Sequence, residues 1–67
     1  MSSDDEIAVV YNKKDGKWYV ACVIAGNIDI VLTRGEAFAI ERDAINHAKN
    51  LQRRCGTEYG IMFYEDD

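Results

Sequence analysis

The chain of 67 residues contains no proline, one histidine and two cysteines. Without proline, turns and helix ends must be placed from glycine and from the hydrophobic pattern. One histidine and two distant cysteines are too few for a zinc site or a disulfide framework. We therefore expect no metal, and we interpret Cys22 and Cys55 as free, buried thiols that pack as small hydrophobic residues.

Long apolar runs are also missing. The longest is far short of the ~20 residues that a membrane-spanning helix needs. The first residues, Met-Ser-Ser-Asp-Asp-Glu, lack the basic start of a signal peptide. We expect a cytoplasmic protein that does not contact membranes.

The sequence shows no pattern typical of an enzyme. His47 has no serine or cysteine placed beside it by spacing, and Glu41 and Asp43 stand near a helix start, where acidic residues suit the helix dipole. The five glycines are isolated, so no phosphate-binding loop is present. We expect no catalytic residue, no cofactor and no metal ligand.

The composition is that of one small folded domain spanning residues 1–67. Hydrophobic residues make up 48% and charged residues 30%, which is typical of a globular protein. The net charge of −4 comes from acidic residues gathered at the two ends. We expect residues 1–5 and 65–67 to be frayed and solubilising.

The hydrophobic pattern predicts four strands and one helix. Strands at 7–11 and 17–25 flank an Asp15-Gly16 turn, a third strand at 28–32 follows Gly26-Asn27, and a fourth covers 59–64. Apolar residues recur every three or four positions through 41–55, which predicts an amphipathic helix. Its start stays open between residues 34 and 41, because 37–40 could instead extend a strand.

This order predicts an α+β fold of the type β-β-β-α-β. Three strands form an antiparallel meander, and the amphipathic helix packs on one face of the sheet. A right-handed crossover then places the fourth strand beside and parallel to the first, in the order 3-2-1-4.

The segment from Lys17 to Leu32 is apolar on both faces of its expected strands. One helix can cover one face, so the other face predicts a partner, most simply a second copy of the chain. We therefore expect a non-enzymatic interaction module that forms a homodimer or binds another protein. Its core and interface draw on large apolar residues, and the candidate interface residues are Trp18, Tyr19, Val23, Ile30 and Phe63.

Two alternatives stay open. The first is a nucleic-acid-binding accessory protein that uses its basic residues Lys13, Lys14, Lys17, Arg53 and Arg54. The acidic net charge argues against it, because such domains are usually basic. The second is a small viral-type inhibitor or antitoxin whose acidic ends occupy the basic site of another protein.

The chain resembles small uncharacterised bacterial and viral β-β-β-α-β domains. The likeness rests on a "dG-W" hairpin at Asp15-Gly16-Lys17-Trp18, an "eAi–A" helix within 41–48 and the segment 51–58 before a last strand. It spans roughly residues 9 to 64. In element order the chain is also similar to HicB-type antitoxin domains, which neutralise a small RNA-cleaving toxin, although it lacks their proline-centred strand and appended DNA-binding segment. Both resemblances imply binding and oligomerisation without catalytic residues.

Overall fold

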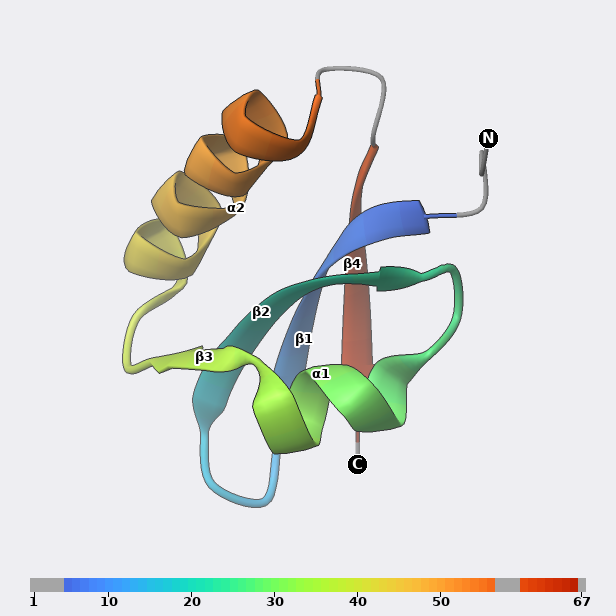
Figure 1. Cartoon of the computed structure of the whole chain (residues 1–67). Helices are drawn as coiled ribbons and strands as arrows, with labels where there is room; N and C mark the ends of the chain where they lie inside the picture. The colour runs from blue at the N-terminus through green and yellow to red at the C-terminus, as the bar shows by residue number, and fades with distance from the viewer. Residues whose placement is uncertain (1–4, 57–59, 67) are drawn as a thin grey trace.

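The computed structural model describes residues 5–56 and 60–66. Four strands and two helices follow one another along the chain (Figure 1). They are β1 (Asp5–Asn12), β2 (Lys17–Ile24), α1 (Ile28–Arg34), β3 (Glu36–Phe38), α2 (Glu41–Cys55) and β4 (Ile61–Asp66).

The strands form one mixed sheet in the order β3-β2-β1-β4. β1 is antiparallel to β2, with Val9 opposite Val20, and β2 is antiparallel to β3, with Trp18 opposite Phe38. β4 runs parallel to β1 and places Phe63 opposite Val9. The α+β class is confirmed, and so is the position of the last strand beside the first.

The prediction of a third strand at 28–32 is wrong, because this segment forms helix α1. Ile28, Val31 and Leu32 lie three and four positions apart and pack together against the sheet. The short strand β3 takes the third position of the sheet instead. The fold therefore has two helices, and the description as a simple meander with one helix has to be corrected.

The two helices lie on opposite faces of the sheet, and each covers its own hydrophobic cluster. The α2-side cluster consists of Ile7, Val9, Val20, Ala44 and Ala48. The α1-side cluster consists of Ala8, Val10, Val23 and Val31. Successive residues of β1 alternate between the two clusters, so this central strand is buried on both faces.

Gly35 permits the close approach of α1 to the sheet. Its N–H donates to the Val31 carbonyl at 2.8 Å and ends the helix. A Cβ atom at this position would lie 2.4 Å from the Val31 carbonyl oxygen and 2.9 Å from that of Val20. Since both are backbone atoms, no side-chain rotation could relieve the contact. Glycine is required here by space, because its φ of −74° suits any residue.

Several boundaries differ from those expected. α2 begins at Glu41, and the region left open before it contains β3. The acidic residues Asp5, Glu65 and Asp66, expected in frayed ends, lie at the ends of β1 and β4. The remaining residues of those ends, 1–4 and 67, and the expected strand start at residue 59 lie outside the described residues.

Candidate functional site

The free edge of β4 is the candidate site. β4 has six residues, whereas β3, at the other edge of the sheet, has three. A very short edge strand offers little backbone for pairing, so a second chain would find a longer template at β4.

The hydrogen bonds to β1 show which backbone groups of β4 face outward. The Ile7 N–H donates to the Gly60 carbonyl at 2.9 Å, and the Lys13 N–H donates to the Asp66 carbonyl at 3.0 Å. In a parallel ladder, alternate residues of a strand bond the same neighbour. The backbone groups of residues 60, 62, 64 and 66 thus face β1, and those of residues 61, 63 and 65 face away from the sheet.

Two large apolar side chains flank this edge. Phe63 is 54% exposed and Met62 is 46% exposed, and as consecutive residues of a strand they point to opposite faces. Ile61 packs against the α2-side cluster. In Figure 1, α2 starts far from β4, and only its C-terminal end comes closer to that strand. The middle of β4 therefore presents apolar surface on both of its faces.

Polar contacts fix β4 against the rest of the fold. The Tyr64 hydroxyl donates to the Glu6 carboxylate, which also accepts the Gly26 N–H at 3.3 Å. This hydrogen bond, burial and the charge of Glu6 together raise the pKa of Tyr64. Glu6 is only 8% exposed, so its two donors replace the water that it loses on folding. The contact joins β1, β4 and the turn before α1.

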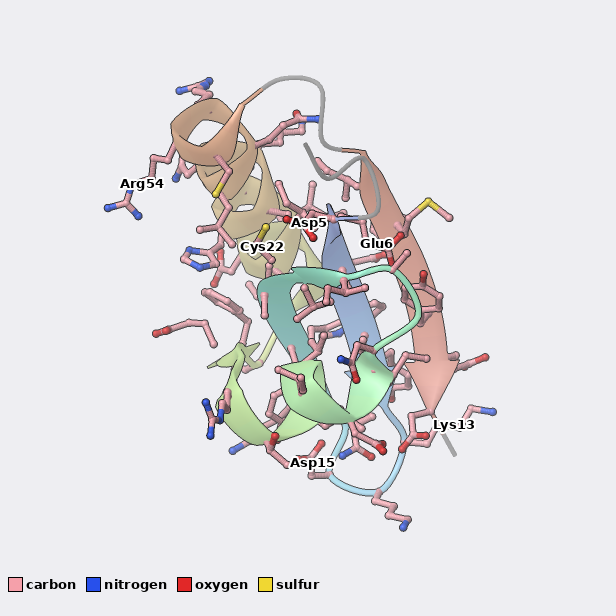
Figure 2. The ribbon with its side chains drawn as sticks, turned by 45° about the vertical axis from the view of Figure 1, so that its right-hand side comes forward. Asp5, Glu6, Lys13, Asp15, Cys22 and Arg54 are labelled. Carbon is pink, nitrogen blue, oxygen red and sulfur yellow. The ribbon has the colours of Figure 1, made fainter. Side chains whose placement is uncertain are left out.

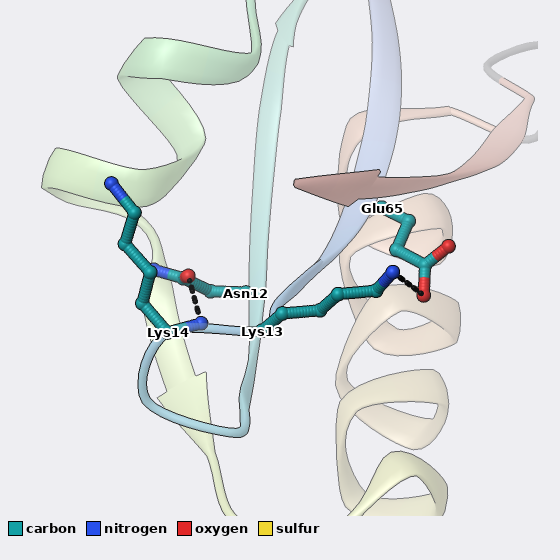
Figure 3. A network of polar contacts seen from close by, with 4 residues as sticks. All are labelled: Asn12, Lys13, Lys14 and Glu65. Atoms are coloured by element: carbon teal, nitrogen blue, oxygen red, sulfur yellow. Dashed lines mark hydrogen bonds and ion pairs between the residues drawn. The ribbon is translucent and has the colours of Figure 1, made fainter. Parts of the chain in front are cut away.

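A second contact holds the far end of β4. The Lys13 Nζ atom lies 3.6 Å from a Glu65 carboxylate oxygen (Figure 3). Both side chains are at least half exposed, so this ion pair adds little stability. It does place a cation beside the acidic end of the strand, which reduces the local negative charge at the edge.

The five candidate interface residues do not form one surface. Trp18 packs on the α2 side, where its ring centroid lies 4.6 Å from that of Tyr11. Tyr19 and Val23 lie on the α1 side, and Val23 is buried there. Ile30 is exposed on α1 and Phe63 on β4.

The sequence did not distinguish Met62 as a candidate. The signal that could have identified it is the position of its segment, since a strand after a crossover helix often ends at an edge. Its neighbour Phe63 was among the candidates, and the two now lie on either side of the same exposed strand.

The basic candidates fall at opposite ends of the molecule. Lys13, Lys14 and Lys17 surround the β1–β2 turn, and Arg53 and Arg54 lie in the last turn of α2. Figure 2 shows Lys13 and Arg54 far apart. The five residues therefore do not provide one continuous basic face of the kind that tracks a nucleic-acid backbone.

The lysine turn also has its own local contacts. Asp15 accepts the Tyr19 hydroxyl and the Lys17 N–H, and Asn12 accepts the Lys14 N–H at 2.9 Å (Figure 3). The Tyr19 hydrogen bond, and then the Lys17 N–H, hold the pKa of Asp15 below its ordinary value. A carboxylate is thus fixed among the lysines, which favours an ordered turn.

The described residues contain no group of three or more histidine, cysteine or acidic side chains arranged to hold a metal ion. His47 lies against Phe38, with 5.1 Å between the ring centroids. Within 5–56 and 60–66, no helix has both the length and the apolar character needed to span a membrane. Comparison with protein-family models, curated proteins and solved structures found no match.

Proposed function

We propose that the chain is a non-enzymatic interaction module that self-associates through the edge of β4 and acts through protein–protein contacts. The observation that carries this proposal is a six-residue edge strand with Met62 and Phe63 exposed on its two faces. Since α1 covers the face that the sequence left without a partner, the proposed interface moves from that face to the edge.

Two copies fit best as antiparallel β4 strands related by a two-fold axis at Phe63. Phe63 then lies opposite Phe63 of the partner subunit, and Ile61 lies opposite Glu65 of the partner subunit. These are the residues whose backbone groups face outward, so each N–H and C=O meets a partner. Met62 packs beside Tyr64 of the partner subunit on the other face, because opposed residues share a face.

Charge favours this orientation over a parallel one. A parallel pair in register would place Glu65 and Asp66 beside their own copies, and like charges directly opposite one another are destabilising. The antiparallel pair separates the acidic ends of the two strands. Met62 and Phe63 are the only exposed large apolar side chains of β4, so we expect a weak dimer with a dissociation constant on the order of micromolar.

We place this module in a reducing compartment such as the cytoplasm, where the exposed Cys22 and Cys55 would stay as thiols until an oxidant reaches them.

The proposal is tested by light scattering during size-exclusion chromatography over a series of protein concentrations. We expect the mass to rise toward that of a dimer at roughly tens to hundreds of micromolar. Phe63→Lys should remain monomeric, because it places two cations face to face at the two-fold axis. Ile40→Lys is the matched control: Ile40 is similarly exposed but lies just before α2, away from β4. A wild-type chain that stays monomeric throughout refutes the proposal.

A second pair of variants tests the backbone contact itself. Both Glu65→Pro and Glu65→Ala remove the ion pair with Lys13. Glu65→Pro also removes the outward-facing N–H of residue 65, which does not bond β1, whereas Glu65→Ala keeps it. We expect Glu65→Pro to weaken the dimer and Glu65→Ala to retain it, with the same circular dichroism for both. Equal dimerisation of the two variants would exclude pairing through this edge.

A further inference from the structure

Cys22 lies on the side of the sheet that α2 covers. It is opposite Ile7 in the β1–β2 ladder, so it shares a face with Ile7 and with Val20, two members of the α2-side cluster. Figure 2 shows Cys22 on β2 against α2.

Cys55 lies on the same side, from the helix. Ala44, Ala48 and Leu51 form the stripe of α2 that packs against the sheet. Cys55 follows Leu51 by four positions and ends the helix, so it extends this stripe by one turn. The helix therefore carries Cys55 toward the row of the sheet that contains Cys22.

The two thiols interact, and both are accessible. The pKa of Cys22 is raised, first by burial of the thiol. The charge of Cys55 and a side-chain hydrogen bond with Cys55 raise it further. Both side chains are exposed, which contradicts the expectation that they are buried hydrophobic residues. Two accessible thiols that interact across different elements can exchange with a small disulfide and then with each other.

We propose that Cys22 and Cys55 form a dithiol site that low-molecular-weight disulfides, such as oxidised glutathione, convert to an intramolecular disulfide joining β2 to the end of α2. The inference is independent of the proposed self-association, because neither cysteine lies on β4.

The exchange takes two steps. The thiolate of one cysteine attacks a sulfur of oxidised glutathione, the glutathione S–S bond breaks, and one glutathione thiolate leaves and takes up the proton released by the protein thiol. The second cysteine, as its thiolate, attacks the protein sulfur of this mixed disulfide and releases the second glutathione with the second proton. Two protein thiols are oxidised, and one disulfide is reduced to two thiols.

The test treats the folded, reduced chain with oxidised glutathione and follows thiol content and mass. We expect the wild type to lose both thiols and two hydrogen atoms, to carry no glutathione and to gain no covalent partner. Cys22→Ser and Cys55→Ser should each stop at one glutathione adduct, because the resolving thiol is missing. The folded wild type should also close the bond faster than the same chain in urea, where nothing holds the thiols together.

A wild type that accumulates two glutathione adducts, or that forms disulfides only between chains, overturns the proposal. So does closure that is equally fast in urea, since that would show no contribution from the fold. Circular dichroism of both serine variants checks that they retain the fold, and both substitutions are at exposed positions.

Discussion

Replacing Gly35 with alanine tests the packing of α1 against the sheet. The added Cβ would lie 2.4 Å from the Val31 carbonyl oxygen and 2.9 Å from the Val20 carbonyl oxygen. Both contacts are far inside van der Waals distance, so the end of α1 or the middle of β2 has to shift. Such overpacking costs typically about 1 to 3 kcal/mol, and because two backbone segments are involved we expect about 2 to 3 kcal/mol.

This loss is large for so small a domain. Stabilities of roughly 0.05 to 0.15 kcal/mol per residue give about 3 to 10 kcal/mol for a chain of this length. The melting temperature should fall by about 10 to 20 °C, since each kcal/mol shifts a domain of this size by roughly 4 to 8 °C. Urea unfolding followed by circular dichroism measures the free energy of unfolding, and thermal unfolding gives the melting temperature.

Gly60→Ala provides the matched control. No atom outside its chain neighbours lies within 4 Å of a Cβ at this position. Alanine also reduces the conformational freedom of the unfolded chain, so this variant should be neutral or slightly more stable than the wild type. If the free energy of unfolding of Gly35→Ala lies within about 0.5 kcal/mol of that of the wild type, the close approach of α1 to β2 is incorrect.

Further substitutions test individual contacts. Tyr64→Phe should lower the free energy of unfolding, because the buried Glu6 loses a donor. The pKa of Tyr64 is raised above its ordinary value of 10.0. The stability that this hydroxyl contributes is therefore present below pH 10.0 and is lost as pH rises through the raised pKa. Urea unfolding at rising alkaline pH should thus show a smaller loss of stability in the variant than in the wild type. Tyr19→Phe should raise the pKa of Asp15 in an NMR titration, because the hydrogen bond from the Tyr19 hydroxyl lowers that pKa in the wild type. This hydrogen bond contributes stability above pH 3.8, and the contribution is lost as pH falls through the lowered pKa. Val31→Ala removes methyl groups from a fully buried site and should cost about 2 kcal/mol in urea unfolding; a loss near zero would show that α1 adds little to the core.

The sequence predicts the part of the fold whose hydrophobic pattern is long and regular. The periodicity through 41–55 correctly predicts α2 and its end at Cys55, whereas the sequence left its start open between residues 34 and 41. The Asp15-Gly16 turn correctly places β1 and β2 on either side of it. The right-handed crossover correctly places β4 beside β1. Each of these features depends on local patterns or on a general rule of chain topology.

Helix α1 lacks comparable local signals. Ile28, Ile30 and Val31 are β-branched and favour strands, and Asn27 makes no side-chain capping hydrogen bond. The helix forms because its apolar stripe packs on the α1-side cluster, which is a tertiary effect that overrides propensity. Because residues 28–32 were predicted as a strand, the sequence predicted an uncovered sheet face where α1 lies, and the candidate interface was placed on that face.

The pairing of β1 with β4 has a consequence for how the chain is made. Most of the sequence separates the two strands, although they lie side by side in the sheet. During synthesis β1 can pair with β2 early, but its other edge stays open until β4 leaves the ribosome. A ribosome-bound chain therefore exposes an unpaired edge of β1, which has more buried residues in the folded domain than any other described strand. Another nascent chain could add the missing strand at this edge. β4, which is translated after the other three strands of this sheet, thus both completes the sheet and ends this interval of vulnerability.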